Sequence, residues 1–171
     1  METNRLKYLL HKCYDSYWHK MIYNDINDYN KDSGNKLRTY RTFKKCISYE
    51  KYLNLKNFEK RKNITQLRIS AHKLKIETGR FNSKINYIPP EQRFCTNCSM
   101  NITEDERHFI LHCPLYSDLR KELFLKCSSM NTLFTTYSPN NKFIWILSSE
   151  NMEHLNVLGG FIINALKVRK D

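Results

Sequence analysis

Hydrophobic residues recur every three or four positions in several stretches of the chain, which is the spacing of one face of an α-helix. The first such stretch covers residues 5–24. Its apolar positions are Leu6, Leu10, Cys13, Tyr17 and Met21. This pattern predicts an amphipathic helix that packs on the rest of the protein, and the polar residues 24–35 after it predict a loop.

The central part of the chain carries the longest helical pattern. Residues 57–78 predict one continuous helix that ends at Gly79, a residue type that suits a helix end. Its buried stripe is Ile64, Leu67, Ala71 and Leu74. A shorter helix is expected over residues 48–55. The link over residues 81–93 contains Pro89-Pro90 and should be extended.

The C-terminal part predicts further helices. Leu115, Leu119 and Leu123 recur at a spacing of four. Residues 131–137 give no clear signal. Residues 141–148 are too apolar to be exposed, and periodicity leaves both a buried helix and a strand open. A last amphipathic helix has its apolar positions at Leu155, Leu158, Phe161, Ile162, Ala165 and Leu166.

No internal repeat and no clear strand alternation is present, so the predicted fold class is mainly α, a helical domain with one small zinc knuckle. We expect four parts. They are an N-terminal helix and polar loop (1–35), a basic helical segment (36–88), a zinc knuckle with its following helix (89–128), and C-terminal helices that pack on the core (129–171).

The zinc knuckle is predicted from the order and spacing of four residues. Cys95 and Cys98 are separated by two residues, nine residues then precede His108, and four more precede Cys113. Three thiols and one imidazole are a ligand set that zinc favours, and a site with four protein ligands is normally structural. We therefore predict a structural Zn²⁺ as cofactor, held by Cys95, Cys98, His108 and Cys113.

The local sequence supports two of these ligands. Residues 103–106, Thr-Glu-Asp-Glu, fit a capping box that would start a helix carrying His108. Pro114 suits the first position of the next helix and leaves Cys113 in the turn between the two. Two other interpretations stay open, in which the cysteines are core hydrophobes or form disulfides. His112 is an alternative fourth ligand.

The net charge of +12 is concentrated in one segment. Residues 31–94 hold seventeen Lys and Arg against five Asp and Glu, whereas the flanking parts are balanced. Such a concentration is typical of a protein with a polyanionic partner, although a solvated basic surface is the simpler alternative. Tyr40 and Phe43 lie between basic residues and would either stack on bases or anchor the segment to the core.

The candidate nucleic-acid contacts are therefore basic residues of this segment. Arg61, Arg68 and Lys75 are spaced seven apart and would form a straight stripe along the predicted long helix. The full set is Lys36, Arg38, Arg41, Lys44, Lys45, Arg61, Arg68, His72, Lys75 and Arg80.

No apolar run approaches the length of a transmembrane helix, and the charged N-terminus lacks the apolar stretch of a signal peptide. We therefore expect an intracellular protein, nuclear or cytoplasmic, with reduced thiols. Cys13, Cys46 and Cys127 are scattered singly and are expected at core or neutral positions.

Four stretches carry a resemblance. They are residues 34–43 (GNKLRTYRTF), 67–80 (LRISAHKLKIETGR), 93–98 (RFCTNC) and 104–113 (EDERHFILHC). Together they resemble the region after the polymerase in LINE-type (non-LTR) retrotransposon reverse transcriptase proteins, which carries a Cys-Cys-His-Cys zinc-binding module. The resemblance implies contact with template RNA or target DNA. Because the chain has no paired-Asp polymerase motif and no acidic metal cluster, it looks like a detached fragment of such a protein.

Three functions follow from these features. The first is a zinc-stabilised module that binds RNA or DNA with weak sequence preference and has no polymerase or endonuclease activity of its own. The second is a zinc-stabilised protein-interaction module, or a non-functional remnant of a retrotransposon protein. The third, an enzyme, is disfavoured because a catalytic zinc needs an open coordination position.

Overall fold

The computed structural model describes residues 2–23, 37–80 and 88–170, and the side chains from residue 4 onward. Its helical elements, with η marking short 3₁₀ or π turns, are α1 (Glu2–Tyr23), α2 (Arg38–Phe43), η3 (Lys51–Asn54), α3 (Phe58–Arg68), α4 (Lys75–Thr78), η4 (Pro90–Gln92), η5 (His108–His112), η6 (Pro114–Tyr116), α5 (Ser117–Met130), η7 (Thr132–Thr136), α6 (Pro139–Ser148) and α7 (Met152–Val168). The described residues contain no strand, and Phe94 and Thr103 form one isolated antiparallel bridge. The predicted mainly α fold is confirmed.

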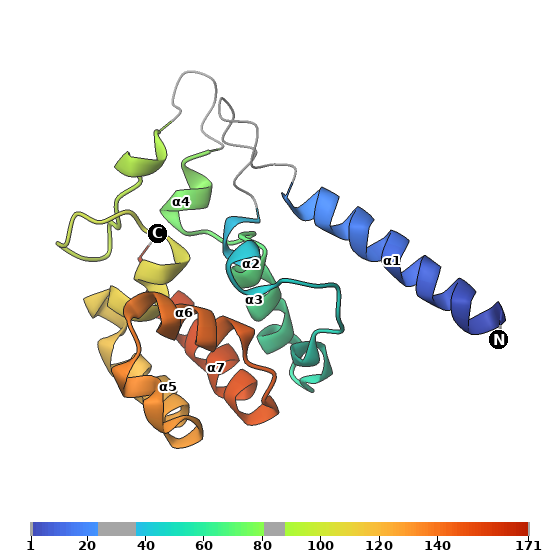
Figure 1. Cartoon of the computed structure of the whole chain (residues 1–171). Helices are drawn as coiled ribbons and strands as arrows, with labels where there is room; N and C mark the ends of the chain where they lie inside the picture. Colours follow the sequence, from blue (N-terminus) through green and yellow to red (C-terminus); the bar gives the residue numbers. More distant parts are fainter. Residues whose placement is uncertain (1, 24–36, 81–87, 171) are drawn as a thin grey trace.

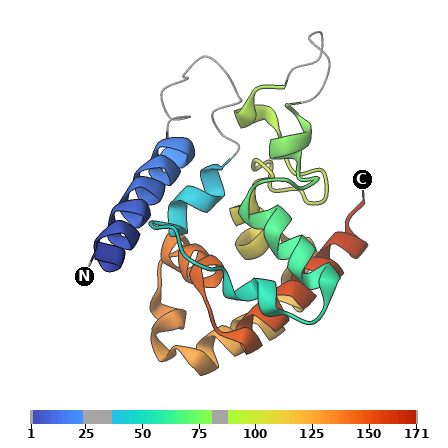
Figure 2. The ribbon, with the colours of Figure 1, turned by 90° about the vertical axis from the view of Figure 1, so that its right-hand side faces the viewer.

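Helix α7 forms the centre of the core (Figures 1 and 2) and packs against both α3 and α5. Leu155, Leu158 and Ala165 on α7 are fully buried. Ile64 of α3, Leu123 of α5 and Ile146 of α6 are equally inaccessible and complete the same core. Burial of each such aliphatic side chain stabilises the fold by about 1.5–3 kcal/mol.

Helices form over the C-terminal stretches with helical periodicity, and the caps of these helices explain where they begin. Residues 141–148 lie in helix α6, where the Ser138 side chain accepts a hydrogen bond from the Asn141 N–H and Pro139 takes the first turn. Asn151 caps α7 in the same way. Helix α5 begins at Ser117, so Leu115 precedes it and is exposed, while Leu123 is buried as expected.

The predicted helix over residues 57–78 is wrong as a single element. Helix α3 ends at Arg68, and α4 begins only at Lys75. Ser70 adopts a left-handed conformation (φ 55°), and the Ala71 N–H donates to the Gln66 carbonyl in the manner of a Schellman motif. The Ser70 hydroxyl donates to Glu106 at 2.7 Å, and this distant contact favours the turn over a continued helix. The helix expected over residues 48–55 is reduced to the 3₁₀ turn η3.

Helix α1 forms as predicted, but its apolar face does not pack on the described part of this chain. It projects from the body of the protein (Figure 1), and Leu6, Tyr17 and Met21 are each more than half exposed. Only its C-terminal end touches α2, where the Trp18 and Tyr40 rings lie 6.3 Å apart.

The predicted loop over residues 24–35, Lys36 and the middle of the link 81–93 lie outside the described residues. Within the described chain, no helix combines the length and the apolarity needed to span a membrane. Cys127 is buried in the core, whereas Cys13 and Cys46 are exposed.

Two neighbouring glycines of α7 give a test of the α3–α7 packing. A Cβ added at Gly159 would lie 2.7 Å from Lys60 Cβ, whereas one at Gly160 would meet only Lys60 Nζ at 3.9 Å. We expect Gly159→Ala to destabilise the fold by about 1–3 kcal/mol through overpacking. Gly160→Ala should stabilise it by about 0.5–1 kcal/mol through helix propensity. Urea unfolding of both variants checks this pair, and equal effects of the two would contradict the close approach of the helices.

A buried histidine predicts a pH dependence of stability. His154 has no accessible surface, and neither ring nitrogen has a hydrogen-bond partner among the described residues. Burial lowers the pKa of His154 to about 4 from its usual 6.5. Above pH 6.5 the His154 ring is neutral in both the folded and the unfolded state. Below pH 6.5 the ring takes up a proton in the unfolded state before it does so in the folded state. Stability should therefore fall between pH 6.5 and 4, by roughly 2 kcal/mol at pH 5.

The matched variant is His154→Phe, which keeps an aromatic ring beside Trp145, 5.1 Å away, and cannot titrate. We expect the unfolding free energy of the wild type minus that of the variant, measured in urea, to be lower at pH 5 than at pH 7 by roughly 2 kcal/mol. A difference independent of pH would show that the wild-type ring titrates normally.

Candidate metal centre and the basic segment beside it

Cys95 and Cys98 lie in a short hairpin that precedes the core helices. The Cys95 N–H donates to the Ile102 carbonyl and the Glu104 N–H donates to the Arg93 carbonyl, each at 2.9 Å. The chain reverses through Asn101, which has a positive φ of 52°, a conformation that asparagine tolerates better than most residues. The hairpin thereby directs both thiols to one side.

His108 and Cys113 bracket the π turn η5. The Asp105 carboxylate accepts a hydrogen bond from the His108 N–H at 2.7 Å and so caps this turn. At its other end the Cys113 N–H donates to the His108 carbonyl at 2.8 Å, and Pro114 opens η6 directly afterwards. Cys113 therefore occupies a turn between two helical elements, as the sequence predicted.

The two halves bring four ligand atoms together. The ligand atoms of Cys95, Cys98, His108 and Cys113 all lie within 4.8 Å of one another. His108 Nε2 lies 3.4 Å from Cys98 Sγ. The predicted ligand set is thus assembled as a possible metal site.

The surroundings suit a cation. Cys95, His108 and Cys113 are buried and Cys98 is half-buried. Burial lowers the pKa of His108 and so favours the neutral imidazole, which is the form that binds metals. Burial also raises the pKa of the Cys95 thiol to about 12 and raises the pKa of Cys113. A divalent cation at the centre would reverse this effect, because thiolates are the metal-binding form.

Neither competing interpretation of the cysteines describes this geometry. All six cysteines are free, so no disulfide forms. Core packing alone does not account for an imidazole nitrogen in contact with a thiol. His112 is exposed and stands outside the cluster.

The capping box predicted for residues 103–106 is wrong. Asp105, not Thr103, caps the turn, and the Thr103 hydroxyl instead lies 3.5 Å from the Pro90 carbonyl. Glu104 and Glu106, which the capping box would place at the start of a helix, are each only 1% exposed. Both carboxylates bind to groups elsewhere in the chain.

Glu104 lies beside Cys95 and binds groups from two other parts of the chain. Its carboxylate forms an ion pair with Arg169 of the C-terminal tail, accepts from the Lys75 N–H at 2.8 Å, and lies 3.6 Å from Cys95 Sγ. The Lys170 N–H also donates to Asn97 Oδ1 at 2.9 Å. The C-terminal end of α7 is therefore fixed to the hairpin.

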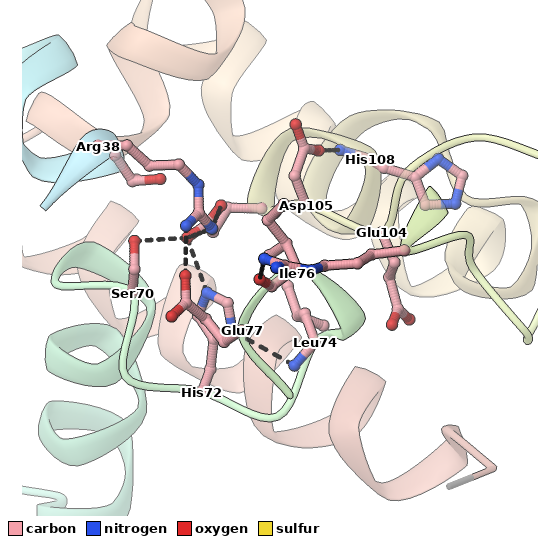
Figure 3. Close-up of polar contacts among 12 residues, drawn as sticks. Arg38, Ser70, His72, Leu74, Ile76, Glu77, Glu104, Asp105 and His108 are labelled. Carbon is pink, nitrogen blue, oxygen red and sulfur yellow. Dashed lines mark hydrogen bonds and ion pairs between the residues drawn. The ribbon is translucent and has the colours of Figure 1, made fainter. Parts of the chain in front are cut away.

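Glu106 accepts hydrogen bonds from three side chains of the basic segment 36–88. Arg38 donates to both of its oxygens at 2.7 Å, and Ser70 and His72 lie within 2.8 Å of the same carboxylate (Figure 3). The His72 Nδ1 accepts from the Leu74 N–H, so Nε2 carries the proton toward Glu106. Arg38 also forms an ion pair with Glu77.

Several predicted nucleic-acid contacts therefore have internal partners. Arg68 is 3% exposed, binds Glu50 and the Leu147 carbonyl at 2.6 Å each, and stacks on the rings of Phe43 and Tyr52. Lys44 is buried with its Nζ 2.6 Å from Glu50. Arg80 pairs with Glu77 at 3.3 Å.

The stripe of Arg61, Arg68 and Lys75 does not form, because α3 ends before Lys75 and Arg68 points into the core. The Arg61 guanidinium donates to the Leu55 and Lys56 carbonyls. Lys75 is half-buried. Arg41 donates to the Ile22 carbonyl, and Lys45 is exposed with its Nζ donating to the Arg41 carbonyl.

Sequence reasoning missed two exposed lysines beside the turn after α3. Lys62 and Lys73 line a hollow of about 440 Å³ together with Asn63, Gln66 and His72. Glu59, Leu166 and Arg169 also line it. The assumption of one continuous helix concealed this arrangement, because only the break at Ser70 turns Lys73 back beside α3.

Comparison of the chain with protein-family models, with curated proteins and with solved structures finds no match.

The cluster makes a prediction about ligation. Cys98→Ser removes one thiolate with little change in size, so the metal content of the purified protein should fall well below one ion per chain. His112→Ala, in contrast, should leave the content unchanged, because this side chain is exposed and outside the cluster. Elemental analysis checks both. Retained metal in Cys98→Ser, or lost metal in His112→Ala, would assign the ligands differently.

Proposed function

We propose that the chain is a zinc-stabilised module that binds the backbone of RNA or DNA. Zinc is the metal that best suits three thiolates and one imidazole. With Zn–S near 2.3 Å and Zn–N near 2.0 Å, a tetrahedron has an S···N edge of about 3.5 Å. The separation of 3.4 Å between Cys98 Sγ and His108 Nε2 fits that edge.

The zinc would be structural. Four protein ligands leave no open position for a substrate or water. The nearest buried carboxylate, Glu104, already binds Arg169 and the Lys75 N–H and so is not available as a general base. We therefore propose that the module has no enzymatic activity of its own.

The observation that carries the nucleic-acid proposal is the hollow lined by Lys62 and Lys73. Both lysines are exposed and come from the segment that holds the whole charge excess. The Asn63 and Gln66 amides beside them can donate to phosphate oxygens, as neutral side chains commonly do in nucleic-acid complexes. Lys62 lies 3.8 Å from Glu59 in an exposed ion pair, which is weak enough for a phosphate to replace.

The expected binding has weak sequence preference. Lysine contacts to phosphates position a protein on nucleic acid but carry no sequence information. The resemblance to the region after the polymerase in LINE-type retrotransposon proteins supports the same function and suggests template RNA or target DNA as partner. Because the ligands must stay reduced, the module would act in the nucleus or cytoplasm.

The test is the salt dependence of binding by the metal-loaded protein to duplex DNA and single-stranded RNA. Affinity should fall with salt because phosphate contacts release counterions. Replacing Lys62 and Lys73 together by Gln should reduce the log-log slope by about 1.4 on single strands and about 1.8 on duplex DNA.

The matched control replaces Lys121 and Lys126 by Gln, which removes the same charge from the balanced C-terminal part. Both lysines lie on α5, and neither lines the hollow. Their loss should change the slope much less. Equal losses in both double variants would refute the proposed location, and a wild type that does not bind at low salt would refute the function.

A further inference from the structure

A second candidate site is a groove of about 600 Å³ between α5, η7 and α6. Phe124, Leu125 and Phe134 supply its apolar lining. Leu125 is 73% exposed even though Leu123 and Cys127 of the same helix are fully buried. Leu133 on the adjoining η7 is 60% exposed. Exposed apolar side chains gathered around a groove are typical of an interaction site.

The groove is also positively charged. Its ionisable lining residues are Arg120, Lys121 and Lys142, with no acidic residue among them. Lys121 pairs with Asp118, but both side chains are exposed and the pair is weak. No carboxylate of the described chain lies within ion-pair distance of Lys142, whose Nζ lies 5.8 Å from the centre of the Phe134 ring.

Arg120 adds a buried charge to this lining. It is 8% exposed and donates to the carbonyls of Ile110 and Cys113 at 2.6 and 2.7 Å. Both acceptors are neutral backbone groups. The groove therefore combines an apolar lining with cations that lack close carboxylate partners, except for the exposed Lys121.

We propose that this groove binds an acidic amphipathic helix of a partner protein. Apolar side chains three and four residues apart on that helix would cover Leu125 and the accessible part of Phe124. Carboxylates along its edges would lie beside Lys121 and Lys142. Helices that insert an apolar face into a groove are a common mode of recognition, and the lysines would set the sign of the partner's charge.

Charge argues against a second copy of this chain as the occupant. Helix α1 offers exposed apolar residues, but residues 1–23 hold four basic and two acidic side chains, which the groove would repel. The low exposure of the aromatic rings in the groove argues against stacked nucleic-acid bases as the occupant. Stacking needs an open aromatic face, whereas Phe134 is 1% exposed and Phe124 is half-buried. The groove shares no lining residue with the hollow of Lys62 and Lys73. The proposal for the groove therefore does not depend on the proposed function.

The experiment uses the whole metal-loaded chain and a fluorescent synthetic helix with Leu at every third or fourth position and Glu elsewhere. The matched probe has Lys in place of Glu. We expect the acidic helix to bind and the basic helix to bind at least about tenfold more weakly. Leu125→Glu should weaken the acidic helix by about tenfold or more, because it removes apolar burial and adds a repelling charge. Lys142→Glu should weaken it similarly.

Leu53→Glu is the control, because Leu53 is 46% exposed on η3 and does not line the groove. It should leave the affinity unchanged. An unchanged circular dichroism spectrum establishes that Leu125→Glu folds. Equal binding of the two helices, insensitivity to both groove variants, or displacement of the bound helix by a single-stranded oligonucleotide would each overturn the proposal.

Discussion

The cluster of three cysteines and one histidine is the constraint that joins the hairpin of residues 93–104 to the helical core. Its first two ligands come from a hairpin that has little apolar burial of its own, since Phe94, Met100 and Ile102 are all exposed. One bridge and a few hydrogen bonds would not keep such a hairpin folded in water on its own, and Arg169 and Lys170 provide its contacts with the C-terminal tail. Its last two ligands belong to η5 and the turn after it, whose Phe109 and Ile110 are buried in the helical core. A bound ion would therefore add its binding free energy to the joining of hairpin and core.

The buried carboxylates, together with the half-buried Glu50, pair with much of the basic charge. Glu50, Glu77, Glu104 and Glu106 together bind Lys44, Arg68, Arg38, Arg80, His72 and Arg169. Removing one partner of such a pair costs about 3–5 kcal/mol, because the other charge stays buried. The excess charge of residues 31–94 thus has two parts. One part pairs with carboxylates inside the protein and links α2 to α4 and to the residues before η5, and the other part faces solvent.

The sequence was sufficient for features with a local cause. Spacing predicted α7 because its apolar stripe is long, and Ser138-Pro139 explains the start of α6. The clustering of Cys95, Cys98, His108 and Cys113 as a possible metal site was predicted because the spacing of such sites along a chain is short and regular. The sequence was insufficient where a contact with a residue far along the chain determines the local structure. Nothing local marks Ser70 as left-handed, since its hydroxyl partner Glu106 lies far along the chain.

The same limit explains other errors of the sequence-based predictions. Residues 103–106 satisfy the pattern of a capping box, but the Glu106 carboxylate is buried and binds Arg38. Asp105 caps the turn instead. Counting charges along a predicted helix placed Arg68 on the surface, whereas its guanidinium stacks on Phe43 and Tyr52. In helix α1 the apolar periodicity predicted the helix correctly, but periodicity does not specify what a helix packs against.

X-ray absorption at the zinc edge tests the central claim most directly, because it reads the ligand atoms around the ion in the purified, undenatured protein. A closed site formed by Cys95, Cys98, His108 and Cys113 predicts three sulfur atoms near 2.3 Å and one nitrogen near 2.0 Å. A first shell made of oxygen and nitrogen atoms only, or the absence of zinc from freshly purified protein, would contradict the account.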